Sequence, residues 1–305
     1  MGDFMRVLSL GAAIAALLSS PGGGAEIELG PVHYTPVDPG FDRKVPARGP
    51  ITDNGISYHG GPVMGTNPDF SNTPNIYFVW YGNWAGDTAL TILPDFASNL
   101  GGSPYFNINT SYYDGSGNPV INLANFGGSS SDSYSQGSVL SVSRVGNIVA
   151  GALSRGDLPL DINGVYFVLT SADVTEGRFC SRYCGWHTWG TYQGTPVKFS
   201  FVGNPQRCLN ACARNRTTSP NGNLGADGMA NLIAHEFEES VTDPQLDAWW
   251  QDGTGQENAD LCAWTFGATW TEPNGSLANM TLGTRDYLIQ QNWVNALGGY
   301  CDLSY

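Results

Sequence analysis

The stretch Asp227-Gly-Met-Ala-Asn-Leu-Ile-Ala-His-Glu-Phe-Glu-Glu-Ser-Val-Thr-Asp-Pro244 carries the strongest structural and chemical signal in this sequence. Its apolar residues recur at intervals of three or four, the spacing of an amphipathic helix; they are Met229, Leu232, Ile233, Phe237 and Val241. Asp227 and Gly228 suit the start of a helix. Asp243 marks the end, because the proline that follows pushes it out of helical geometry. The stretch is therefore predicted to form a helix with one apolar face.

The centre of this helix has the residue types of a metal site. His235 and Glu239 are four residues apart and therefore lie on one face. Their side chains both bind zinc well, with bonds of roughly 2.0–2.2 Å. Glu236 falls about 100° around the helix from His235, in line with the apolar residues, where a carboxylate is expensive to bury without a cation or a proton. We therefore predict His235 and Glu239 as metal ligands on a zincin-like active-site helix.

The motif H-E-x-x-E is related to H-E-x-x-H, in which the middle glutamate acts as general base on a metal-bound water. By this relation Glu236 is the predicted catalytic residue. The alternative is a helix with a solvated acidic edge and a hydrogen-bonded histidine, and spacing alone does not separate the two. The position of Glu236 inside the apolar arc favours the metal site, whereas Glu238 is expected on the opposite, solvated face.

A catalytic zinc usually takes three protein ligands and a water. Glu257 follows Glu239 by 18 residues, a spacing close to the thermolysin-like pattern, and is the first choice as third ligand. Asp260 and Asp243 are alternatives, although Asp243 is more simply a turn residue that ends the helix. His187, which closely follows Cys180 and Cys184 in the sequence, could ligate the metal, stabilise an oxyanion or have a structural role.

The predicted function is therefore a metal-dependent hydrolase, most simply a peptidase acting on extracellular proteins or peptides. Zinc would lower the pKa of its water toward about 7, and Glu236 would take the proton. One histidine with several carboxylates is an anionic ligand set that could also suit Ca²⁺ or Mn²⁺. Zinc remains the expected ion. His33 and His59 are expected to be ordinary loop histidines.

The N-terminus resembles a secretory signal over residues 1–25, because Arg6 precedes an apolar run that small residues follow. The run is too short to cross a bilayer, which takes about 20 residues, and no later segment is long and apolar enough. Residues 26–56 are rich in proline, glycine and charge and are predicted to be a leader or linker. Residues 57–305 are predicted to form a single domain.

The composition is that of an extracellular protein. Charged residues make up 13% of the chain, about half the usual share, and the formal net charge of −14 argues against binding nucleic acid or an anionic membrane. Six cysteines in an exported chain are expected to pair. Their spacing leaves the pairing open, but Cys262–Cys301 is preferred. Sequons begin at Asn109, Asn215, Asn274 and Asn279.

Runs of apolar and β-branched residues predict strands at 76–81, 119–123, 164–170 and 197–202. Helical spacing predicts helices at 89–100 and 138–153, and the Ser/Gly-rich stretch 127–137 is predicted to be a loop. Strands alternating with helices indicate an α/β or α+β fold, with a mixed central sheet flanked by helices and loops braced by disulfides.

Several motifs together resemble the phosphate-induced protein 1, or EXORDIUM-like, family; they are Tyr58-His-Gly-Gly-Pro62, Trp80-Tyr-Gly82, the run 164–174, Phe179-Cys-x-x-x-Cys-Gly-Trp-His187 and Val202-Gly-Asn204 with Cys208-x-x-x-Cys212. The resemblance spans about Tyr58 to Cys301. It implies a secreted, apoplastic or cell-wall protein, linked in plants to growth control with no settled activity. It also favours a structural or separate role for His187. With its H-E-x-x-E-x-V-T-D-P motif, this sequence resembles microbial members that look like metallopeptidases.

A non-catalytic function is the second hypothesis. Tryptophans gather in sequence around the predicted site, and aromatic faces are common in sugar-binding platforms; they are Trp186, Trp189, Trp249, Trp250, Trp264 and Trp270. The protein would then be an extracellular module that binds cell-wall polysaccharide or a partner protein, with at least half of these tryptophans in the core. A glycosidase using Glu236 and a second acid ranks last, because His235 would have no task.

Overall fold

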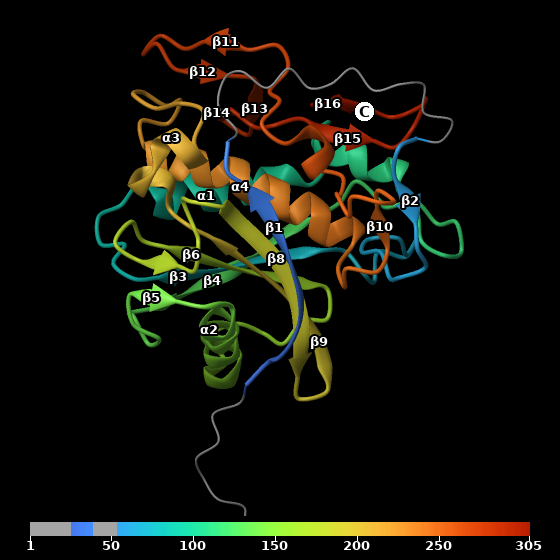
Figure 1. Ribbon diagram of the computed structural model, residues 1–305, viewed down its shortest axis with the longest axis horizontal. Helices are drawn as coiled ribbons and strands as arrows, with labels where there is room; N and C mark the ends of the chain where they lie inside the picture. Colours follow the sequence, from blue (N-terminus) through green and yellow to red (C-terminus); the bar gives the residue numbers. More distant parts are fainter. Residues whose placement is uncertain (1–25, 39–53) are drawn as a thin grey trace, which may run out of the picture.

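The computed structural model describes residues 26–38 and 54–305 (Figure 1). Its centre is a six-stranded mixed sheet in the order β1-β8-β9-β6-β3-β4; the strands are β1 (Glu28–Pro36), β3 (Asn75–Tyr81), β4 (Asn125–Asp132), β6 (Gly164–Thr170), β8 (Tyr183–Tyr192) and β9 (Thr195–Val202). Strands β9, β6, β3 and β4 run parallel, and β1 and β8 add an antiparallel edge. The predicted mixed sheet flanked by helices is confirmed.

The central strands are buried on both faces, which explains why they are continuous apolar runs and not alternating ones. Every residue of β6 is buried, and in β3 all but Asn75 are. Helices cover the two faces of the sheet: α2 (Val142–Arg155) lies on one side, and α1 (Ala89–Leu100) and α4 (Leu224–Thr242) lie on the other (Figure 1). The strands predicted at 76–81, 164–170 and 197–202 and the helix predicted at 89–100 are confirmed.

The remaining elements are short. They are β2 (Ser57–Tyr58), η1 (Phe106–Ser111), β5 (Val139–Leu140), β7 (Thr175–Glu176), η2 (Pro205–Arg207), α3 (Leu209–Cys212), β10 (Trp249–Trp250), η3 (Asp260–Cys262), β11 (Trp270–Thr271), β12 (Leu277–Ala278), β13 (Met280–Leu282), β14 (Arg285–Tyr287), β15 (Asn292–Val294) and β16 (Tyr300–Asp302). Among residues 26–38 and 54–305, no helix has the length and apolar character that a membrane crossing requires.

Helix α4 begins at Leu224, capped by the Asn223 side chain, three residues before the predicted start at Asp227. It ends at Thr242, directly before Asp243, as predicted. It is not amphipathic in the expected way. It lies between the sheet and the C-terminal hairpins (Figure 1), so nearly every residue is buried. The prediction that Glu238 is solvated is therefore wrong: Glu238 is 0% exposed and accepts a 2.9 Å hydrogen bond from Asn292.

The edges of the sheet differ most from the sequence predictions. Residues 28–36, predicted as part of a leader, form β1 and pair with β8. The register shifts between Leu29 and Val32, which accommodates Pro31 on an edge strand. The first half of the predicted loop at 127–137 belongs to β4, whose serines and glycines pair with β3. The strand predicted at 119–123 does not form. Edge strands need little apolar burial, so their sequences lack the apolar runs by which strands are predicted.

Three disulfides brace the loops around α4. Cys262–Cys301 forms as predicted, whereas the other four cysteines pair across the two CxxxC segments, as Cys180–Cys208 and Cys184–Cys212. The second of these joins β8 to α3, shortly before α4 begins. Disulfides of this kind restrict the unfolded chain and stabilise small loop-rich regions. The β8 strand, the 257–262 segment and the C-terminus are therefore held close to α4.

Candidate metal centre

Side chains from four chain segments converge where β1 and β8 meet the C-terminal half of α4. We call this set the histidine–carboxylate cluster; it consists of His33, His187, His235, Glu236, Glu239, Glu257 and Asp260. Two groups within it have ligand atoms lying within 4.8 Å of one another, and both groups include Glu239. The cluster therefore has the residue types and the spacing of a metal centre.

Helix α4 supplies the central pair. His235 Nε2 lies 3.0 Å from Glu239 Oε1, as residues four apart on one helical face should. Both side chains are 0% exposed. The geometry that the sequence predicted for these two residues is present, and both point to the same interior space.

Strands β1 and β8 face the helix with matching residues. His33 is directly opposite His187 in the β1–β8 register, and their ring centroids are 5.5 Å apart. Side chains two residues apart share a face of a strand, so Thr35 lies on the same side as His33. The expectation that His33 is a loop histidine is wrong. The run Val32-His-Tyr-Thr35, bounded by prolines, was the signal that could have revealed the strand.

The segment that follows α4 completes the cluster. Glu257 Oε1 lies 3.3 Å from His187 Nε2 and 3.3 Å from His33 Nδ1. Asp260 Oδ2 lies 2.6 Å from His33 Nε2, and its Oδ1 lies 3.5 Å from His235 Nε2. Glu257, Asp260 and His187, which the sequence offered as alternatives for one position, are thus all present together.

Asp243, an alternative ligand, and His59, expected to be a loop histidine, both lie outside the cluster. Asp243 Oδ1 accepts hydrogen bonds from the backbone N–H groups of Asp247 and Ala248, both at 2.7 Å, so it is the turn residue that the sequence favoured. His59 lies in a loop and stacks on Trp250, with ring centroids 3.5 Å apart. Neither side chain belongs to the histidine–carboxylate cluster.

Burial leaves many polar atoms of the cluster without a hydrogen-bond partner. They are His187 Nε2, both ring nitrogens of His235, Glu236 Oε2, Glu239 Oε2, Glu257 Oε2 and Asp260 Oδ1. Buried polar atoms in native proteins are nearly always paired, and an exception calls for an explanation such as a bound ion. His33, with 20% of its side chain exposed, lies at the rim.

Burial and neighbouring charges shift the pKa values of these groups strongly in the metal-free protein. Burial lowers the pKa of His33, but the charges of Glu257 and Glu239 and the hydrogen bond to Asp260 outweigh it and raise that pKa to about 10. Burial raises the pKa of Glu257 to about 8. For Glu239 the effect of burial is outweighed by the charges of His235 and His33, which lower its pKa. The cluster therefore favours bound positive charge, either as protons or as a cation.

Glu236 is positioned differently from the other carboxylates. Thr35 Oγ1 donates a hydrogen bond to its Oε1, and its Oε2 has no partner. Burial raises its pKa to about 7. Gly185 lies opposite it, and a Cβ there would lie 2.7 Å from Glu236 Oε1, so the carboxylate would have to shift. Glu236 is therefore a buried carboxylate that can exchange a proton near neutral pH.

The tryptophans do not form one platform. Trp186 and Trp249 are in the core, Trp189, Trp250 and Trp264 are partly buried, and Trp270, on the β11 strand, is 41% exposed. The expectation that at least half of them are core residues is wrong, because only these two of the six are buried. An aromatic surface for sugar would have to be built around Trp270.

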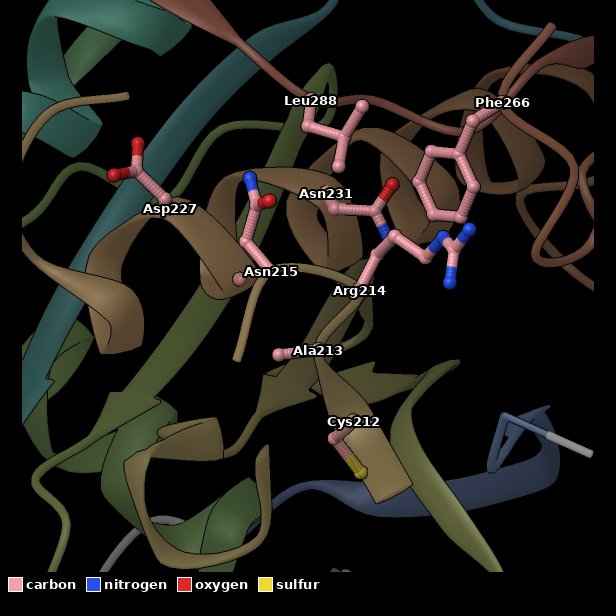
Figure 2. A pocket seen from close by; sticks show the side chains of 9 residues that line it. Cys212, Ala213, Arg214, Asn215, Asp227, Asn231, Phe266 and Leu288 are labelled. Atoms are coloured by element: carbon pink, nitrogen blue, oxygen red, sulfur yellow. The ribbon is translucent and has the colours of Figure 1, made fainter. Parts of the chain in front are cut away.

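Two cavities lie along the N-terminal half of α4, away from the cluster. Figure 2 shows the first, where Asn231 of α4 lies beside Phe266 and Leu288. Its volume of about 20 Å³ has room for one water. The second, of about 380 Å³, lies at the helix N-terminus and is lined mainly by hydroxyl and amide side chains; they include Thr88, Gln206, Thr217, Thr218, Ser219, Asn223 and Asn274.

Comparison with known proteins agrees with the resemblance. Residues 56–283 match the family described as phosphate-induced protein 1 conserved region. The chain is 30% identical over 277 residues to Protein EXORDIUM-like 5 of Arabidopsis thaliana, covering 78% of this chain and 75% of that protein. It is 28% identical over 284 residues to Protein EXORDIUM-like 3 of the same plant, covering 81% and 82%. No solved structure matches it. The chain therefore belongs to the phosphate-induced protein 1, or EXORDIUM-like, family.

Proposed function

We propose that this EXORDIUM-like protein is a secreted, extracellular metal-binding protein in which the ion braces a non-catalytic binding domain. The observation that carries the proposal is the set of unpartnered, buried nitrogen and oxygen atoms on β8, α4 and the 257–260 segment. A cation at their centre would satisfy these atoms and join the segments.

The ligand set supports zinc. The proposed ligands are His235, Glu239 and Glu257; His187 contacts Glu257, and Asp260 contacts His235. Imidazole nitrogen suits zinc and other transition metals, whereas Ca²⁺ prefers a shell made of oxygen alone. Three histidines in the cluster therefore disfavour calcium and leave Mn²⁺ as the second choice.

Burial supports a stabilising role for the ion. His235, Glu236 and Glu239 are 0% exposed, and His187 and Glu257 are 1% exposed. An extended peptide must reach a catalytic metal directly, so a site this deep would have to open first. The names of the plant relatives indicate no enzymatic activity, which agrees with a binding protein.

The partner that fits this reading is a neutral cell-wall polysaccharide. The cavity of about 380 Å³ is lined mainly by neutral donors and acceptors, and none of its lining residues is charged. Asn274, in the turn that follows the strand carrying Trp270, lies at its edge. Hydroxyl and amide groups pair well with sugar hydroxyls, and an exposed indole provides an apolar face.

The first test is metal content. Protein purified without chelator is expected to contain zinc at one equivalent or more, and removal of the metal with EDTA is expected to lower the melting temperature because the carboxylates lose their cation. Re-addition of Zn²⁺ should restore the melting temperature. A metal-free protein whose melting temperature does not respond to Zn²⁺, Mn²⁺ or EDTA would contradict the proposal.

A zinc-dependent peptidase is the second candidate, and Glu236 is the observation that favours it. Its pKa of about 7 matches a general base that works at neutral pH, and its free Oε2 is available for a water. Zinc, when bound, supplies the Lewis acidity that activates such a water. Glu236 would accept the water's proton and later deliver it to the leaving amine.

Hydrolysis of casein or gelatin by the zinc-loaded protein separates the two candidates. We expect none. A peptidase would show activity that Glu236→Gln lowers by about 10²–10⁴-fold and that the exposed control Glu28→Gln leaves unchanged. Activity with that pattern would replace the non-catalytic proposal. Binding to insoluble polysaccharide by the Glu236→Gln variant would support the non-catalytic proposal.

A further inference from the structure

The histidine–carboxylate cluster has two sets of ligands, and they share one residue. His33, Glu239 and Asp260 offer ligand atoms that lie within 4.8 Å of one another, and so do His187, Glu236 and Glu239. Only Glu239 belongs to both sets. We infer that the cluster binds two divalent cations side by side, bridged by the carboxylate of Glu239; this inference rests on the proposed metal-binding function.

The two oxygens of Glu239 face different partners. Oε1 lies 3.0 Å from His235 Nε2 and accepts the backbone N–H of Asp260 at 3.2 Å. Oε2 lies 3.4 Å from His187 Nε2 and has no hydrogen-bond partner. A carboxylate with each oxygen directed to a different imidazole has the arrangement of a bridging ligand, which holds two ions about 3.5–4 Å apart.

The other side chains lie around the two oxygens, and Glu257 contacts both sides. On the Oε1 side, Asp260 contacts both His33 and His235. Glu257 Oε1 lies 3.3 Å from His187 Nε2 on the Oε2 side and 3.3 Å from His33 Nδ1 on the other side. The first ion would be held by His33, His235, Asp260 and one oxygen of Glu239. The second would be held by His187, Glu236, Glu257 and the other oxygen.

Unpartnered buried atoms lie on both sides of the bridge. His235 Nε2 and Asp260 Oδ1 belong to the first set, and His187 Nε2, Glu236 Oε2 and Glu257 Oε2 belong to the second. One ion bound at either set would leave the atoms of the other without a partner. Two ions satisfy both sets.

Charge balance is compatible with two ions. The cluster contains four carboxylates and three imidazoles, which are neutral when they ligate metal. With one divalent cation, protons on the groups that do not bind it would have to balance the two remaining negative charges. Two divalent cations balance the four carboxylates without added protons.

The test is the number of ions bound by the full-length protein. Native mass spectrometry of protein loaded with Zn²⁺ and desalted is expected to show about two ions per chain. His187→Gln and Asp260→Asn, one from each side, should each retain about one, and Glu239→Gln should retain fewer than either. His59→Gln, a histidine outside the cluster, should keep both ions.

Loading with Mn²⁺ adds a second readout, since two ions that share a carboxylate give an exchange-coupled electron paramagnetic resonance spectrum. Wild-type protein with a single zinc and an uncoupled manganese signal would overturn the two-ion inference and leave the single-ion function standing. Protein without bound metal would overturn both. Wild type alone decides this, so a variant that fails to fold does not affect the result.

Discussion

Replacing Glu239 with glutamine is expected to remove most of the metal and to lower the melting temperature of the metal-loaded protein by roughly 10 °C. Glu239 is 0% exposed and lies between His235 and His187, at 3.0 and 3.4 Å. Removing one member of a buried charged set costs about 3–5 kcal/mol, which in a chain of this size corresponds to roughly 2–4 °C per kcal/mol. Metal analysis and calorimetry measure both effects.

Glu238→Gln is the matched control on the same helix. Glu238 is equally buried but accepts its hydrogen bond from Asn292, outside the cluster. Burial raises its pKa well above the ordinary value, which favours the neutral acid, and an amide resembles a neutral acid in size and polarity. If Glu239→Gln kept its metal, or if Glu238→Gln lost it to the same extent, the central role of Glu239 would be wrong.

The second large effect is a change in the pH dependence of stability when the metal is removed. In the metal-free protein, burial raises the pKa of Glu236 to about 7 and of Glu257 to about 8, from an ordinary value of 4.5. The charges of Glu257 and Glu239 outweigh burial and raise the pKa of His33 from 6.5 to about 10. All three groups bind protons more tightly in the folded state than in the unfolded state.

Proton linkage gives the direction in which the stability of the metal-free protein changes with pH. The stabilisation from Glu236 and Glu257 is fully present below pH 4.5 and is lost as the pH rises through about 7 and 8. That from His33 is present below 6.5 and is lost as the pH rises through about 10. Glu239, with a lowered pKa, acts in the opposite sense only at lower pH. The metal-free protein should therefore lose stability from pH 5 to pH 8, on the order of 3 kcal/mol per carboxyl group at most.

The metal-loaded protein should behave in the opposite way, because its ligands bind the ion only when deprotonated. The melting-temperature difference between the zinc-loaded and EDTA-treated protein is therefore expected to widen from pH 5 to pH 8. Thermal denaturation at a series of pH values measures it, with ionic strength held constant. A difference that is constant or narrows over this range would show that these carboxyl groups do not bind the ion.

How far the sequence predicts this molecule depends on the burial of each segment. The strands at 76–81 and 164–170 are covered on both faces, so their sequences are apolar throughout and easily recognised. Strands β1 and β4 lie at the two edges, where partial exposure permits proline, glycine and serine, and neither was predicted. Glu238 was predicted in solvent because helical spacing does not reveal that the C-terminal hairpins cover the second face of α4.

The residues of the candidate site also differ in how far the sequence could predict them. The pairing of His235 with Glu239 was predictable because residues four apart on a helix are neighbours whatever surrounds them. Glu257 and Asp260 followed as candidates from their position after the helix. His33 could not be placed, since its approach depends on an edge strand that joins β8 from more than 150 residues away in the sequence.

The sequence by itself determined the central helix, the buried strands and the position of His235 beside Glu239 on one face of α4. Local geometry decides these, because helix and strand periodicity act over a few residues. Only the tertiary structure decided that His33, His187, Glu257 and Asp260 meet Glu239 in one buried space. Their meeting depends on sheet order and cysteine pairing, which are long-range contacts that no local pattern encodes.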